Sequence, residues 1–114
     1  MRIAVGSDHA GFHLKQELAA HIRASGHEVV DCGAHSDDRV DYPDFGAAVG
    51  RAVRDGDADA GLCVCGSGIG IAMAANKIAG IRAATVHDVT SARLTKQHND
   101  ANVICIGERL TGPE

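Results

Sequence analysis

Residues 59–76 read DAGLCVCGSGIGIAMAAN, and this stretch decides the fold. A short apolar run ends at Cys65, Gly66, Gly68 and Gly70 alternate with other residues, and a run of small apolar residues follows. We interpret the stretch as a buried strand, a glycine-rich turn and the start of a helix. Backbone N–H groups at such a turn bind anions and developing oxyanions. A cysteine at this junction can act as a base or a nucleophile, because its thiolate is stabilised there.

Composition limits the chain to one compact domain with few aromatic side chains. Its 114 residues, 1–114, suffice for a single domain, and 45% of them are hydrophobic but only 3% aromatic. We therefore expect a core of Val, Ile, Leu and Ala. The formal net charge of −4 argues against a general nucleic-acid binder. No apolar run approaches the ~18 residues that are needed to span a membrane.

The cysteines favour a reducing compartment. Cys63 and Cys65 fall in one predicted strand, and Cys32 and Cys105 fall at or near the ends of others. This is not the pattern of a disulfide framework, so we predict free thiols and a cytoplasmic protein. The first residues lead directly into a predicted strand, which is unlike a signal peptide.

Strand patterns alternate with helix patterns along the chain. The predicted strands are residues 3–5, 28–31, 61–65, 81–86 and 102–106. Four helices are predicted. The first carries apolar residues at 14, 18 and 22, and the second runs from Pro43 to Gly56. The third runs from 69 to about 78, and the fourth from a cap at Asp88 to about 97. Apolar strands that alternate with helices predict a three-layer, doubly wound, Rossmann-like α/β domain with a five-stranded parallel sheet.

Reactive side chains follow several of the predicted strands and helices. Asp8 and His9 follow the first strand, Cys65 and Ser67 surround the end of the third, and His98 comes after the fourth helix. Active sites on parallel sheets lie at the carboxyl ends of the strands, so we expect these groups at one edge. A carboxylate, imidazoles and a thiol beside an oxyanion-binding turn suit proton transfer at a carbon next to a carbonyl.

Each of these residues also has a structural interpretation. Cys65 could be a small buried hydrophobic residue, as most strand cysteines are, and we expect this of Cys63 and Cys105. Asp8 could cap the first helix. His98 could be a cation that is favoured at a helix C-terminus.

Three other kinds of site fit the sequence less well. The dinucleotide-binding fingerprint fails because Ile71 stands where its third glycine belongs, and the turn follows the third strand rather than the first. Ser67 lacks the Gly-x-Ser-x-Gly context of a nucleophile elbow. A metal site would need Cys63 and Cys65 together with His9 or His98, and we predict none.

Five blocks of the sequence resemble the type B ribose-5-phosphate isomerase family, which includes galactose-6-phosphate isomerase subunits and allose-6-phosphate isomerase. The blocks occur in the family's order: SDHAGF (7–12), DYP (41–43), CGSGIG (65–70), AANK and GIRA (74–83) and HNDANV (98–103). The resemblance covers residues 2 to about 112. It implies a doubly wound five-stranded sheet.

The resemblance also implies a reaction. It is the interconversion of ribose 5-phosphate and ribulose 5-phosphate through an enediolate, with neither metal nor cofactor. The family forms a homodimer, or a homotetramer made of paired dimers, with sites at the subunit interface. The sugar is left open, since allose 6-phosphate, galactose 6-phosphate or a four-carbon sugar phosphate would suit the same chemistry. A second hypothesis is a weakly catalytic partner subunit.

The resemblance assigns a role to each matching residue. Cys65 would be the base that moves a proton between C2 and C1. Ser67 and the N–H groups of Gly66, Gly68, Ile69 and Gly70 would hold the enediolate. Asp8 and His98 would open the furanose ring, and Asn99 would bind sugar hydroxyls. His9 and Arg109 would help to hold the phosphate, and Tyr42 would line the pocket.

The end of the sequence departs from the family pattern. Gly112-Pro113-Glu114 reads as the start of a further helix, and the last predicted strand would otherwise leave apolar surface uncovered. We expect that the native chain continues into the C-terminal helix of the family, which carries further phosphate-binding arginines. A dimer partner that covers this surface is the alternative.

Overall fold

A computed structural model describes residues 1–111 of the chain. The strands are β1 (Arg2–Ser7), β2 (Glu28–Asp31), β3 (Ala60–Cys65), β4 (Ala83–Thr85) and β5 (Val103–Gly107). The helices are α1 (Phe12–Ala24), α2 (Tyr42–Arg54), α3 (Ile69–Asn76) and α4 (Val89–Asn99). The helix predicted to start at Gly112 lies outside the described residues. Within residues 1–111, no helix is both long and apolar enough to cross a membrane.

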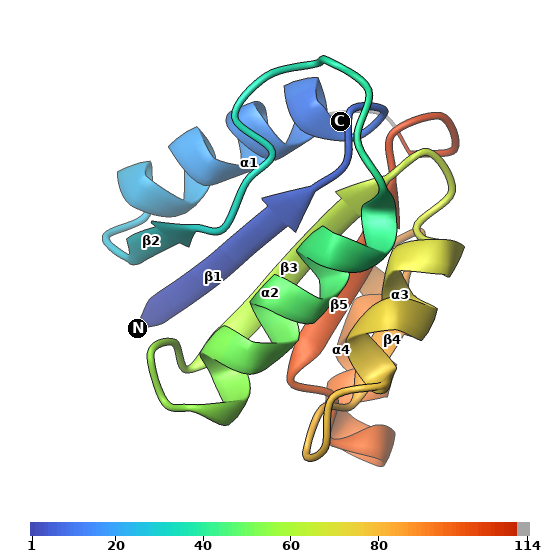
Figure 1. Cartoon of the computed structure of the whole chain (residues 1–114). Helices are drawn as coiled ribbons and strands as arrows, with labels where there is room; N and C mark the ends of the chain where they lie inside the picture. The colour runs from blue at the N-terminus through green and yellow to red at the C-terminus, as the bar shows by residue number, and fades with distance from the viewer. Residues whose placement is uncertain (112–114) are drawn as a thin grey trace.

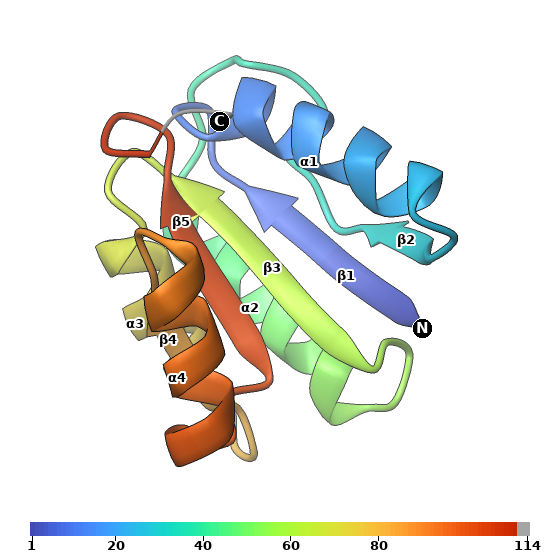
Figure 2. The same cartoon turned by 180° about the vertical axis from the view of Figure 1, so that it is seen from behind.

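The sheet is parallel throughout and has the order β2-β1-β3-β5-β4. Helices α2 and α3 cover one face (Figure 1), and α1 and α4 lie on the other (Figure 2). The predicted three-layer, doubly wound α/β fold is therefore confirmed. The chain crosses from one half of the sheet to the other in the connection from β2 to β3, so the switch point lies between the neighbouring strands β1 and β3. Such a point leaves a crevice at the carboxyl ends of the strands.

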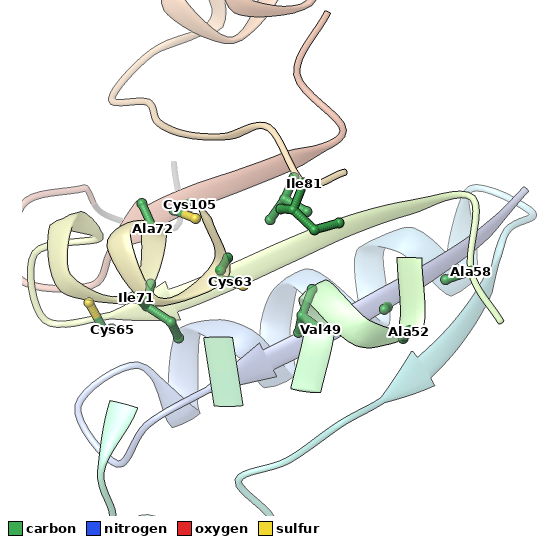
Figure 3. Close-up of a cluster of buried hydrophobic side chains, with 12 residues drawn as sticks. Val49, Ala52, Ala58, Cys63, Cys65, Ile71, Ala72, Ile81 and Cys105 are labelled. Atoms are coloured by element: carbon green, nitrogen blue, oxygen red, sulfur yellow. The ribbon is translucent and has the colours of Figure 1, made fainter. Parts of the chain in front are cut away.

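The larger part of the core lies between the sheet and helices α2 and α3 (Figure 3). It is aliphatic, as predicted, with Val49, Ile71 and Val103 fully buried. Cys63 and Cys105 are register neighbours on β3 and β5, and neither is exposed. A hydrogen bond with Cys105, together with burial, raises the pKa of the Cys63 thiol well above its usual value. These two cysteines are thus packing residues, as the sequence predicted.

Two glycines on α2 allow α3 to pack closely against it. A Cβ on Gly46 would lie 2.8 Å from the carbonyl oxygen of Ile71, and one on Gly50 would lie 3.0 Å from Cγ1 of Ile78. The close approach fixes α3 over β3 and β5. It therefore also fixes the glycine-rich turn from which α3 begins.

Two predicted boundaries were wrong in ways that matter for the site. The fourth strand is Ala83–Thr85 rather than 81–86, because a turn joins Ile78 to Ile81 and the Asn76 side chain pairs with both backbone groups of Ala83. Helix α4 continues to Asn99, so His98 lies inside its last turn rather than after it.

Candidate active site

A cleft of about 330 Å³ opens at the carboxyl ends of β1, β3 and β5. We refer to it as the carboxyl-edge cleft. Its lining residues are Asp8, His9, Ala10, Tyr42, Cys65, Gly66, Ser67, Gly70, Arg109 and Leu110. Apart from Ala10 and Leu110, every one of them is a residue singled out from the sequence. The cleft lies where the switch between β1 and β3 predicts a binding site.

Cys65 ends β3 and is held by the turn that follows it. Its side chain is 5% exposed, and its Sγ accepts a hydrogen bond from the N–H of Gly68 at 3.1 Å. Gly68 adopts φ +78°, and a Cβ there would lie 2.8 Å from the carbonyl carbon of Ile106. Only glycine fits both conditions. The turn thus directs a donor at the sulfur, which stabilises negative charge on it.

Ser67 shapes the start of α3. Its Oγ accepts a hydrogen bond from the N–H of Ile69 at 3.1 Å, and the Thr85 hydroxyl donates to the carbonyl of Gly68 at 2.9 Å. The Ser67 hydroxyl keeps its own proton to donate to a ligand. With the N-terminus of α3 beside it, this turn is suited to an oxyanion.

Asp8 lies in the turn before α1 and lines the cleft, but it is not the cap of that helix, as the alternative interpretation had it. Its Oδ1 accepts a hydrogen bond from the N–H of Gly11 at 3.0 Å, which shapes the turn into α1, while the cap position of the helix is Gly11 itself. The residue is 7% exposed and lines the carboxyl-edge cleft. One carboxylate therefore stabilises the turn and also faces the cleft.

The His9 ring is oriented by a backbone segment that sequence reasoning missed. Its Nδ1 lies 3.1 Å from the carbonyl oxygen of Val40 and 3.2 Å from the Val40 nitrogen. Both contacts use the same ring nitrogen, so Nε2 is the nitrogen available to a ligand. Residue type gives no signal for Val40, because the contact is made by its backbone.

Tyr42 and Arg109 close two sides of the cleft, each against a glycine. A Cβ on Gly70 would lie 2.8 Å from Cε1 of the Tyr42 ring. A Cβ on Gly66 would lie 3.3 Å from Nη1 of Arg109. Arg109 is exposed at the mouth of the cleft. Leu110, which the sequence reasoning missed, follows it, and its position just beyond a strand end was the available signal.

The expectation that His98 and Asn99 share this edge was wrong for a single chain. Helix α4 runs antiparallel to the strands, so its last turn returns to the amino edge of the sheet (Figure 2). The backbone carbonyl oxygen of Asn99 accepts a hydrogen bond from Nε of Arg82 at 2.6 Å, and Arg82 is the residue just before β4. His98 and Asn99 are both exposed.

A second cavity, of about 350 Å³, lies at that amino edge. Asn76, Arg82 and Asn99 supply its main polar groups. The Asn76 amide is already paired with the Ala83 backbone, and Arg82 Nε with Asn99. Within residues 1–111, His, Cys, Asp and Glu side chains do not gather into a group that could hold a metal ion. The chemistry-bearing residues are therefore concentrated at the carboxyl-edge cleft.

The family described as Ribose/Galactose Isomerase matches residues 3–114. The chain belongs to this family. Ribose-5-phosphate isomerase B of Escherichia coli K12 is 49% identical over 99% of this chain and 76% of its own length. The galactose-6-phosphate isomerase subunit LacB of Clostridium acetobutylicum is 44% identical over 98% of this chain and 65% of its own length.

Solved structures agree with the sequence comparison. The structure of ribose-5-phosphate isomerase B from Clostridium thermocellum superposes with a TM-score of 0.98 at 49% identity, over 99% of this chain and 76% of that one. The ribose/galactose isomerase resemblance found in the sequence is thus confirmed for both the family and the fold.

Proposed function

We propose that this member of the ribose/galactose isomerase family interconverts ribose 5-phosphate and ribulose 5-phosphate through an enediolate. The chain is an aldose–ketose isomerase, as its ribose-5-phosphate isomerase B relatives are. One observation carries the mechanistic part of the proposal. Cys65 Sγ receives the Gly68 N–H at 3.1 Å at the edge of a cleft whose size suits a small sugar phosphate.

Cys65 is the proposed base for the proton transfer between carbons. Its thiolate removes the proton from C2 of the open-chain aldose and returns it to C1, while the proton on the C2 hydroxyl moves to the C1 oxygen. The negative charge that develops on oxygen lies beside the Ser67 hydroxyl and the N–H groups from Gly66 to Gly70. Donors placed where charge develops lower the barrier more than they stabilise the substrate.

The furanose ring must open before C2 becomes acidic, and this needs a second acid–base pair. Asp8 lines the cleft of its own chain, but His98 lies at the opposite edge of the sheet. His98 and Asn99 can reach a cleft only if it belongs to a second copy. The proposal is therefore a homodimer, alone or paired into a tetramer, in which each cleft combines Asp8 of one chain with His98 of the other.

His9 and Arg109 are the proposed phosphate ligands. They stand on either side of the cleft, one after β1 and one after β5. A guanidinium can bind two phosphate oxygens at once, and an imidazole can add a third hydrogen bond. Tyr42 lines the wall of the cleft beside Gly70. No metal or cofactor takes part in the proposed reaction.

The choice of sugar and the place in the cell belong to the proposal as well. The four cysteines are free thiols, which agrees with the predicted cytoplasmic location. A galactose-6-phosphate isomerase subunit is among the relatives, so a six-carbon substrate or a partner-subunit role is the second candidate. Asp8 and Cys65 stand together in one cleft and favour an active enzyme over a weak partner.

The test is a substrate panel combined with two cysteine variants. We expect the highest kcat/KM with ribose 5-phosphate among ribose 5-phosphate, allose 6-phosphate, galactose 6-phosphate and a four-carbon aldose phosphate. Cys65→Ala should fold and bind substrate but lose about 10²–10⁴-fold in kcat. Cys32→Ala is the control, because this thiol is half-buried at the end of β2 and burial raises its pKa. Near wild-type turnover by Cys65→Ala would disprove the assignment.

A further inference from the structure

Glu108, the residue just after β5, ties the last turn of the described chain to the first turn of α1. Its Oε1 accepts a hydrogen bond from the N–H of Leu14 at 2.5 Å, across 94 residues of sequence. Helix α1 has no acidic residue in its first turn, and its cap residue, Gly11, offers no side chain to the helix. Glu108 therefore adds a negative charge at the first turn of this helix, beside the Asp8 carboxylate that accepts the Gly11 N–H.

The backbone on either side of Glu108 is fixed to the catalytic turn. Its own N–H donates to the carbonyl of Cys65 at 2.8 Å, and that of Arg109 donates to the carbonyl of Gly66 at 3.1 Å. A Cβ on Gly107 would lie 2.5 Å from the carbonyl carbon of Ser67, so the two segments touch. The turn after β5 thus rests on the β3 turn through its backbone and on α1 through the Glu108 carboxylate.

These contacts join the two sides of the proposed phosphate subsite. Arg109 follows Glu108 directly, and His9 lies in the turn that leads into α1. Glu108 itself is not among the residues that line the cleft. Its carboxylate makes the hydrogen bond to α1, and among the hydrogen bonds of residues 1–111 no other joins the turn that carries Arg109 to this helix.

We propose that Glu108 is a positioning residue for phosphate binding, which sets the separation between Arg109 and His9 by holding the β5 turn against the N-terminus of α1. The inference rests on the proposed function, because it takes the sugar phosphate as the ligand. Without the carboxylate, Arg109 would still be present but would no longer be held opposite His9. The loss would fall on phosphate affinity rather than on the proton transfer at Cys65, which is fixed by Gly68.

The test compares Glu108→Ala with Glu108→Gln, which keeps an acceptor oxygen but loses the charge. We expect Glu108→Ala to raise the KM for ribose 5-phosphate, and the inhibition constant of inorganic phosphate, about tenfold, with kcat within about twofold of wild type. For Glu108→Gln, both constants should lie between those of wild type and those of Glu108→Ala. NMR should show the Leu14 amide proton resonance shifting in both variants.

Asp59→Ala is the matched control. The Asp59 carboxylate also accepts a backbone N–H from a distant segment, that of Arg2 at 2.8 Å, but at the amino edge of the sheet. Asp59→Ala should leave the KM and the phosphate inhibition constant unchanged, even where it lowers the stability of the protein. The inference is overturned if Glu108→Ala and Glu108→Gln leave KM and phosphate inhibition at wild-type values, or if kcat falls instead.

The two proposals fail in different ways. A wild-type protein that does not turn over ribose 5-phosphate contradicts the proposed function. The binding of inorganic phosphate to wild type and variants, measured by calorimetry, then still decides the role of Glu108, since weaker binding in Glu108→Ala supports it and equal binding overturns it.

Discussion

The N–H of Gly68 donates to the sulfur of Cys65 across 3.1 Å, so the proposed base and the donor that holds it lie three residues apart in one turn. The contact requires φ +78° at Gly68 and space where a Cβ would be. Ile106 of the neighbouring strand β5 packs against this turn. The position of the reactive group is therefore set by strand pairing rather than by a flexible loop.

Gly68→Ala should damage catalysis beyond its effect on stability. The added Cβ would lie 2.8 Å from the carbonyl carbon of Ile106, so the turn must move and the donor leaves Cys65. We expect kcat to fall about 10²-fold or more, since one lost oxyanion-type donor costs about that much. Steady-state kinetics and urea unfolding on the same samples measure the two effects.

Gly80→Ala is the control for the backbone cost. Gly80 has a similar φ of +83°, but a Cβ there meets nothing within 4 Å. Both alanine variants should lose about 1–2 kcal/mol of stability from the left-handed backbone alone. Only Gly68→Ala should lose activity. Equal activity in the two would show that the Gly68 donor is dispensable.

Gly70→Ala should weaken substrate binding through Tyr42. A Cβ at Gly70 would lie 2.8 Å from Cε1 and Cζ of the Tyr42 ring, which must then swing away from the cleft wall. We expect KM to rise about 10-fold with a smaller change in kcat. In a Tyr42→Ala background the clash is absent, so Gly70→Ala should add little there. Additive effects of the two substitutions would show that the ring is not the cause.

Strand ends could be predicted from the sequence because apolar runs that stop at Asp8 and Cys65 identify their own boundaries. Parallel pairing then brings the ends together, which is why most of the cleft was found in advance. His98 was misplaced although the predicted parallel sheet already implies its position, because a helix that connects two parallel strands runs back across the sheet and ends at the amino edge. The contacts of Val40 with His9 and of Glu108 with Leu14 span 31 and 94 residues and leave no local pattern.

Asp31 should make stability depend on pH in the acid range. Burial alone would raise the pKa of its carboxyl, but hydrogen bonds from Lys15 Nζ at 2.8 Å and from the N–H of Gly33 at 2.9 Å outweigh burial and lower the pKa below its ordinary 3.8. A lowered pKa means that the folded state prefers the carboxylate. The stabilisation is complete above pH 3.8 and is lost as the pH falls through the lower, folded-state pKa.

The measurement is urea unfolding of wild type and Asp31→Asn from pH 7 to pH 3. At neutral pH the variant should be less stable by about 1–3 kcal/mol, because Lys15 is fully buried and loses its counter-charge. The difference should shrink at the acid end. Asp37→Asn is the control, since its pair with His13 is exposed on both sides. A difference that does not vary with pH would contradict the role of the ion pair.

Mixed dimers should show whether His98 acts in the cleft of the other chain. Cys65→Ala and His98→Asn should each lower the activity of the homodimer strongly, because every cleft then lacks one group. In a mixed dimer, one cleft has lost both groups, but the other combines an intact Cys65 with an intact His98 of its partner.

Co-refolding equal amounts of the two variants should therefore restore activity to about a quarter of wild type, since half of the dimers are mixed and each holds one intact cleft of two. Cys65→Ala mixed with Asp8→Asn is the control. Both of these residues line the cleft of their own chain, so no combination yields an intact site. Recovery in the first mixture but not in the second would place His98 across the interface. If neither mixture recovers activity although mass spectrometry shows mixed dimers, the proposed homodimer site is contradicted.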